Sequence, residues 1–261
     1  MLHPLLAAVS VPVCRRSECR VSRFDFGWLR KVFQWVLLCV FGAVSGGFCV
    51  ASRAASTAAE ADAKFAQVSA WPKVAEWVFD RSSELAGAVS VVPVQGAYPL
   101  VLLPGVSVVE DARAPGGKAL RLDGSQINWA ATTNLLATKE NVYIDLRFCA
   151  SADGAERQTL MKLSKGPEIR INLKTSTVEL ILWTVEKKFV SVRVPYVADE
   201  WSALRASVID GVLTLELNGE IATARMPEGA VIEAGPSRLF LGFYGDRPFK
   251  GSVVYLALHS P

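Results

Sequence analysis

The sequence predicts an all-β protein, a two-sheet antiparallel sandwich preceded by an N-terminal hydrophobic export segment. Apolar and polar side chains alternate along residues 201–220, and two turn dipeptides interrupt that stretch. Further short alternating runs follow one another between residues 142 and 259, with no helical stripe among them. Period-two alternation is typical of half-buried strands, and many short strands must pack as two sheets or close as a barrel.

Residues 201–220 are the clearest element. The side chains expected on the buried face are Leu204, Ala206, Val208, Leu213, Leu215 and Leu217. Asp210-Gly211 and Asn218-Gly219 are dipeptides that type I′ turns favour, because both central residues of such a turn need a positive φ. We therefore expect an antiparallel hairpin, with a third strand after Gly219.

At the N-terminus, Arg30 and Lys31 precede the apolar run Val32–Val50, and a stretch of small residues follows. A basic flank, an apolar core and a small-residue exit are the three parts of a secretory signal. We expect a signal peptide whose true start lies downstream of Met1. The alternative is an uncleaved, single-pass signal anchor, since the apolar run approaches the length of a membrane span. Either one exports the remainder, to a secreted, periplasmic or cell-surface location.

The chain is thereby divided into three parts. Residues 1–51 are a basic leader with the signal peptide or anchor, 52–70 are an alanine-rich linker or short helix, and 71–261 are the folded domain. Residues 85–109 are expected to be loop-like, because prolines and glycines interrupt them. Strands are expected near 77–80, 118–124, 142–148, 159–164, 169–173, 178–183, 190–194, 204–209, 213–217, 238–244 and 251–259.

The charge distribution argues against nucleic acid as a partner. Six of the 28 basic residues and two of the 25 acidic residues lie in 1–51, which leaves 22 basic and 23 acidic residues in the remainder. A near-neutral body without a basic stripe lacks the electrostatic footprint of a nucleic-acid-binding protein.

Histidine and cysteine usage argues against hydrolytic triads and zinc sites. The chain has two histidines, His3 and His259, and the second is expected to be a surface residue at the end of the last strand. If the leader is removed, Cys149 is the single remaining cysteine, so no disulfide framework is expected. A triad needs an imidazole beside its nucleophile, and zinc sites usually need several His or Cys ligands.

Three segments carry a family resemblance. They are G-K-A-L-R-L-D-G at 117–124, W-S-A-L-R-A-S-V-I-D-G-V-L-T-L-E-L-N-G-E at 201–220 and L-F-L-G-F-Y-G-D-R-P-F-K-G-S-V-V-Y-L-A-L at 239–258. Together they resemble the laminin-G-like, concanavalin A-like lectin-glucanase superfamily, over roughly residues 77–259. The resemblance implies a jelly-roll sandwich. It does not fix the function, because this superfamily includes lectins, adhesion modules and glycosidases.

The β-glucan-cleaving members carry paired glutamates on one strand, spaced E-x-D-x-E or E-x-D-x-x-E, where two carboxylates flank the glycosidic bond. This sequence has no such triplet. Its nearest candidates are Asp199-Glu200, which precedes a strand, and Glu216 with Glu220, which straddle a turn. The expected function is therefore a non-catalytic module that binds carbohydrate or an extracellular protein. The alternatives are a degenerate or atypical glycoside hydrolase and a membrane-tethered structural or sensory module, and a membrane is a partner only if Val32–Val50 is uncleaved.

Two sets of candidate binding residues follow. Aromatic side chains that stack on sugar rings are expected among Trp183, Trp129 and Tyr244. Trp183 shares a face with Glu179 and Ile181, and it is either exposed on an outer sheet face or covered by the long 85–115 loop. Related domains bind calcium at a loop rim through oxygen ligands, for which Asp123, Asn128 and Asp246 are the candidates.

Overall fold

The computed structural model describes residues 59–261, except 61, 81–82, 86–87, 135, 138–139 and 234. These residues belong to one compact unit, Ala55–Pro261. The expected leader, including Val32–Val50, lies outside the described residues. In the described part of the chain, no helix is both long and apolar enough to cross a membrane.

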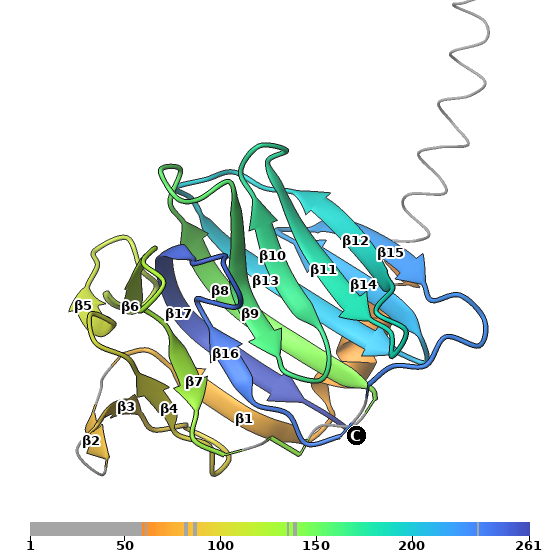
Figure 1. Cartoon of the computed structure of the whole chain (residues 1–261), viewed down its shortest axis with the longest axis horizontal. Helices are drawn as coiled ribbons and strands as arrows, with labels where there is room; N and C mark the ends of the chain where they lie inside the picture. Colours follow the sequence, from red (N-terminus) through yellow and green to blue (C-terminus); the bar gives the residue numbers. More distant parts are fainter. Residues whose placement is uncertain are drawn as a thin grey trace, which may run out of the picture. The chain divides into compact units, whose positions relative to one another are not determined.

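The unit consists of two antiparallel sheets, as the alternation predicts (Figure 1). Sheet A has eight strands and sheet B has nine. In order across sheet A, the strands are β15 (Glu220–Arg225), β14 (Val212–Leu217), β13 (Trp201–Ile209), β8 (Val142–Ala150), β17 (Lys250–His259), β6 (Lys118–Asp123) and β5 (Ser107–Glu110), and β1 (Lys73–Val78) also pairs with β17. In order across sheet B, the strands are β12 (Phe189–Pro195), β11 (Thr177–Trp183), β10 (Glu168–Asn172), β9 (Arg157–Leu163), β16 (Leu239–Leu241), β7 (Ala130–Thr132), β4 (Leu100–Leu102), β3 (Ala88–Val91) and β2 (Ser83–Leu85).

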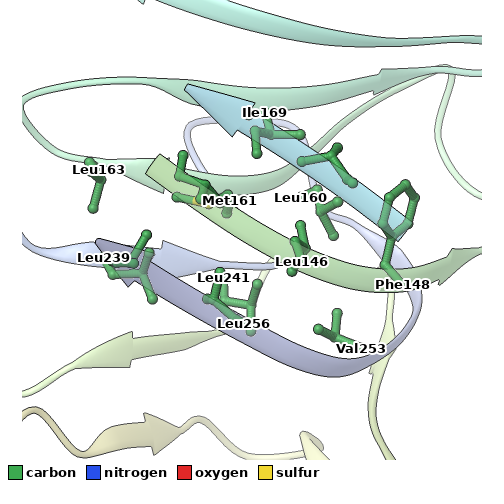
Figure 2. Close-up of a cluster of buried hydrophobic side chains, with 14 of the residues drawn as sticks. Leu146, Phe148, Leu160, Met161, Leu163, Ile169, Leu239, Leu241, Val253 and Leu256 are labelled. Atoms are coloured by element: carbon green, nitrogen blue, oxygen red, sulfur yellow. The ribbon is translucent and has the colours of Figure 1, made fainter. Parts of the chain in front are cut away.

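The inner faces of the two sheets form the hydrophobic core. Leu146 and Leu256 from sheet A meet Leu160 and Leu241 from sheet B, and all four side chains are fully buried (Figure 2). Burial of apolar area on this scale is the main stabilising contribution to a sandwich. Each strand that lines the core therefore has its alternate side chains on an outer face.

The central hairpin is confirmed. Strand β13 pairs with β14 from Leu204–Leu217 to Ile209–Val212, and β14 pairs with β15 beyond the second turn. Both dipeptides have positive φ at both residues: 48° and 73° at Asp210-Gly211, and 51° and 93° at Asn218-Gly219. These are the torsions that the type I′ assignment requires.

The expectation of a loop-like segment at 85–109 is wrong. Strands β3, β4 and the start of β5 lie within it, and β3 and β4 belong to the edge of sheet B farthest from β12. Each spans three or four residues between prolines and glycines, which is too short for alternation to be recognised in the sequence.

A helix at residues 62–69 packs on the outer face of sheet A. Phe65 and Val68 are buried, and the Phe65 ring lies 5.9 Å from that of Tyr143 on β8. Asp62 forms an ion pair with Arg205 on β13 at 2.9 Å. This part of the alanine-rich stretch is therefore packed against the sandwich.

His259 is not a surface residue, contrary to the sequence-based expectation. Its side chain is 4% exposed, and Nδ1 lies 3.0 Å from the carbonyl oxygen of Trp71. Its ring also packs edge-on against Tyr143. The chain segment that precedes β1 covers the end of β17, and His259 is buried for that reason.

Candidate functional site

The outer face of sheet B carries a row of side chains that runs from strand to strand. The cross-strand register aligns Ile181 on β11, Glu168 on β10, Lys162 on β9, Phe240 on β16, Ala131 on β7 and Val101 on β4. Directly opposed residues on antiparallel strands point to the same face of the sheet. Because Ile169 and Leu241, their neighbours along the strands, point into the core, this row lies outside.

Trp183 lies at the β12 end of this face, in register with Phe189. Its ring is half-buried and packs against Phe189 at 5.2 Å between ring centroids. The Arg170 guanidinium lies 5.9 Å from the Trp183 ring centroid. Of the two interpretations that the sequence left open, exposure on an outer face fits better, since strands β3 and β4 of the 85–115 segment form the opposite edge of sheet B.

Trp129 and Tyr244 belong to a second aromatic group on the same face. Phe240 lies between them, 5.7 Å from each ring centroid, and Trp129 also stacks on Phe243 at 6.2 Å. Tyr244 is 36% exposed, and its ring lies 5.8 Å from Lys162 Nζ. The structure thus places all three aromatic candidates on or beside one sheet face.

Between the two aromatic groups lies a buried carboxylate, Glu168, with three cations around it. Arg170 donates from Nε to Glu168 Oε1 at 2.6 Å and from Nη2 to Oε2 at 3.1 Å. Arg247 donates from Nη2 to Oε1 at 3.4 Å, and the Thr159 hydroxyl donates to the same oxygen at 3.0 Å. Trp183 donates from Nε1 to Oε2 at 3.5 Å, so Glu168 also contacts the aromatic pair of Trp183 and Phe189.

Burial alone would raise the pKa of Glu168, whose side chain is 1% exposed. The hydrogen bonds and charge of Arg170, with the charges of Arg247 and Lys162, outweigh this effect and hold the pKa below its usual value. Glu168 is therefore an ionised, fully paired group. Burial lowers the pKa of Lys162, and the charge of Glu168 offsets part of that change.

Sequence reasoning did not identify the charged group formed by Glu168, Lys162, Arg170 and Arg247. Alternation along 168–173 identifies Arg170 as outward-facing but says nothing of its partners. Arg247 lies in the loop between β16 and β17, 79 residues from Glu168. The strand register that brings them together is not encoded in a local pattern.

The calcium candidates are only partly brought together by the fold. Asp123 ends β6 and accepts a hydrogen bond from the Ser125 amide at 2.8 Å, which holds the Asp123 pKa below its usual value. The Asn128 side chain is buried beside Asp123 and also lowers the Asp123 pKa, although neither of its polar atoms forms a hydrogen bond of good geometry within the described residues. Asp246 is exposed in the β16–β17 loop. Oxygen donors suit calcium, but across the described ranges no three His, Cys, Asp or Glu side chains are grouped to hold a metal ion.

Solved structures that share this fold include binding domains of bacterial toxins and one domain of an extracellular arabinanase. The binding domain of botulinum neurotoxin serotype D is 15% identical with a TM-score of 0.54, over 72% of this chain and 48% of that one. The binding domain of Paraclostridial Mosquitocidal Protein 1 is 12% identical with a TM-score of 0.51, over 72% and 47%. This chain thus spans about half the length of those domains. Domain 4 of AbnA, an extracellular arabinanase from Geobacillus stearothermophilus solved with arabinotriose, is 16% identical with a TM-score of 0.51, over 73% and 93%.

These similarities support the β-sandwich fold. No protein-family model matches the chain, and no curated protein matches it either. A shared fold at this level of identity does not fix a function.

Two of the carboxylates that the sequence offers as a glycosidase pair, Glu216 and Asp199, have partners of their own. Glu216 lies on β14 on the outer face of sheet A, where it pairs with Arg205. Asp199 lies in a turn with a φ of 63° and accepts a hydrogen bond from the Ala152 amide. On sheet B, Glu179 pairs with Arg193 at 2.9 Å, next to the Glu168 group.

Two hollows lie beside the 226–232 segment that follows β15. One has a volume of about 670 Å³ and is lined by Glu140, Asp210, Arg225 and Met226 among others. The other, of about 390 Å³, is lined by Phe189, Val190 and Val231 among others. Phe189 also packs on Trp183, so the second hollow borders the aromatic end of the sheet B face.

Proposed function

We propose that this protein is an exported, non-catalytic carbohydrate-binding module, and that a sugar chain lies across the outer face of sheet B. One observation carries the proposal. Trp183 and the group of Trp129 and Tyr244 come from distant parts of the chain, yet they flank the charged group of Glu168, Lys162, Arg170 and Arg247 on the same face. Aromatic rings stack on the apolar faces of sugars, and polar groups between them bind hydroxyls.

The proposal of a non-catalytic module rests on the state of the carboxylates. A glycosidase needs one carboxyl group with a raised pKa as its acid and a second carboxylate facing it. Glu168 has the opposite pKa shift, and the nearby Glu179 is paired with an arginine. Both are suited to hold cations in place rather than to transfer protons.

Two finer parts of the proposal come from the sequence. The jelly-roll, concanavalin A-like type of sandwich rests on the resemblance of residues 117–124, 201–220 and 239–258. Export rests on Arg30, Lys31 and Val32–Val50, and sequencing the N-terminus of exported protein checks it: a start between about residues 50 and 64 supports cleavage, while intact Met1 in a membrane fraction supports the anchor.

Calorimetric titration of the full chain with oligosaccharides tests the binding proposal. Replacing Trp183 by alanine should weaken binding roughly tenfold or more, since a central aromatic contact contributes about 2 kcal/mol. Trp201→Ala is the matched control, because Trp201 lies on the outer face of sheet A. Equal affinity of the Trp183→Ala protein would exclude this ring as the surface on which the sugar stacks, and turnover of a polysaccharide would contradict the non-catalytic assignment.

Repeating the titration with calcium and with a chelator tests calcium as a cofactor at Asp123 and Asn128.

A further inference from the structure

The charged group on sheet B holds more cations than carboxylates. Lys162, Arg170 and Arg247 surround the single carboxylate Glu168. At the border of the face, Glu179 pairs with Arg193 and Glu233 pairs with Lys165. Even if the exposed Asp246 beside Arg247 is counted, three cations face two carboxylates. This local excess contrasts with the near-neutral composition of residues 52–261.

Glu168 arranges two guanidinium groups without using all their donors. Arg170 gives Nε and one N–H of Nη2 to Glu168, and Arg247 gives Nε to Thr159 and Nη2 to Glu168. A guanidinium has five N–H donors, and among the residues that the structure describes neither Arg170 nor Arg247 donates from Nη1. The side chains of Arg170 and Arg247 are 17% and 24% exposed, whereas Glu168 is buried beneath them. A planar guanidinium held in place in this way matches the two oxygens of a carboxylate or sulfate.

Aromatic rings lie on both sides of this pair. Trp183 contacts the Arg170 side, and Tyr244 lies beside Lys162. A sugar ring that stacks on either aromatic side chain would bring its ring substituents near the free guanidinium donors. The Arg170 guanidinium lies 5.9 Å from the Trp183 ring centroid, so a negatively charged substituent of a sugar stacked at Trp183 would lie close to a cation.

We propose that the ligand of this face is an acidic saccharide, one with a carboxylate or sulfate group that the free N–H donors of Arg170 and Arg247 bind. The inference rests on the proposed function, since it names the ligand class of the same face. Lys162 adds to the positive field but is largely occupied, because its ammonium group donates to the carbonyl of Gly166 at 2.9 Å.

The test compares charged oligosaccharides with uncharged counterparts of the same backbone. Trigalacturonate and its methyl ester form one pair, and sialyllactose and its methyl ester form the second. Each is titrated into the full chain. At least one acidic member should bind about tenfold or more tightly than its neutral counterpart, and its affinity should fall as salt rises from about 0.05 M to about 0.5 M, because salt screens exposed charges.

Arg247→Gln should remove about tenfold or more of the affinity for the acidic member, since a charge-assisted hydrogen bond is lost. Arg193→Gln is the matched control. It removes the same charge from the same sheet face, but from the ion pair with Glu179, and it should leave the affinity unchanged. Circular dichroism checks that both variants fold, and the salt dependence of the wild-type protein tests the inference without any variant.

The outcomes separate the two proposals. Equal binding of an acidic saccharide and its neutral counterpart would overturn the inference of an acidic ligand and leave the carbohydrate-binding function in place. An effect of Arg193→Gln as large as that of Arg247→Gln would also overturn it. Binding of neither member of either pair would overturn both proposals.

Discussion

The outer faces of the two sheets differ in what covers their polar side chains. On sheet A, the helix at 62–69 lies over Tyr143 and Arg205, and both Phe65 of the helix and Tyr143 are buried. On sheet B, Trp183 is half-buried and Tyr244 is exposed, with arginines between the two. Both faces carry aromatic and charged residues, so composition alone does not distinguish the packed face from the proposed binding face.

One carboxylate on each face shows the same difference. Glu168 on sheet B is surrounded by cations, and its pKa is lowered despite burial. For Asp145 on sheet A, burial is the largest effect and raises the pKa, while the charges of Arg147 and His259 offset it only in part. Burial also raises the pKa of Tyr143 to about 12. Ion pairing keeps Glu168 charged beneath the partly exposed Arg170 and Arg247, whereas the helix at 62–69 packs on the outer face of sheet A.

The largest expected effect is on the covered face. Phe65→Ala should destabilise the protein by roughly 3 kcal/mol, because it removes a buried ring from the contact with Tyr143 and from beneath Arg205. Urea denaturation measures this loss, and faster hydrogen exchange of 62–69 would show undocking of the helix. Phe189→Ala is the control. Because Phe189 is 54% exposed, this variant should lose much less stability than Phe65→Ala.

The same variant tests whether the two faces are independent. Oligosaccharide affinity should be unchanged in Phe65→Ala, because the helix contacts sheet A and the ligand is expected on sheet B. A loss of affinity as large as that of Arg247→Gln would mean that the outer face of sheet A contributes to binding, and the contrast between the faces would fail.

A smaller effect is expected from Glu168→Gln, which keeps the shape of the side chain and removes its charge. The variant should lose roughly 2 kcal/mol at neutral pH, less than for a fully buried ion pair because the two arginines are partly exposed. Since the folded-state pKa of Glu168 is lowered, its contribution is fully present above the ordinary value of 4.5 and is lost as the pH falls through the lowered value.

Urea denaturation of the wild type and Glu168→Gln from pH 7 to pH 3 measures this contribution. The difference between the two proteins should begin to narrow below about pH 4.5. A difference that widened in acid would contradict the pairing described for Glu168. Glu179→Gln is a suitable control, since its arginine partner is more exposed and the expected loss is smaller.

The sequence predicted the strands more completely than the proposed binding face. Alternation along 178–183 grouped Trp183 with Glu179 and Ile181 on one face of the strand, because side-chain direction within one strand is a local property, but it left open whether that face is exposed. The grouping of Trp129 with Tyr244 depends on the pairing of β16 with β7, and the contact of Arg247 with Glu168 depends on a loop. Such long-range pairings are set by the packing of the whole sandwich, so residue types alone did not indicate them. His259 shows the same limit: its burial depends on the backbone of Trp71.

The smallest expected effect has the opposite sign. Asp145→Asn should stabilise the protein by roughly 1 kcal/mol at neutral pH, because it removes a charge whose burial the neighbouring cations offset only in part. The folded-state pKa of Asp145 is raised, so folding favours the protonated form. The charge of Asp145 therefore lowers the stability of the wild-type protein above that raised pKa, and this effect disappears below the ordinary value of 3.8.

The gain in stability from Asp145→Asn should follow the same pH dependence and vanish in acid, whereas Asp246→Asn, at an exposed position, should change stability little at any pH. Thermal unfolding of the wild type and of the two variants, from neutral pH to below pH 3.8, measures both changes in stability. A loss of stability in Asp145→Asn at pH 7 would show that Asp145 is stabilised by its cations as Glu168 is, and the two faces would then treat their carboxylates alike.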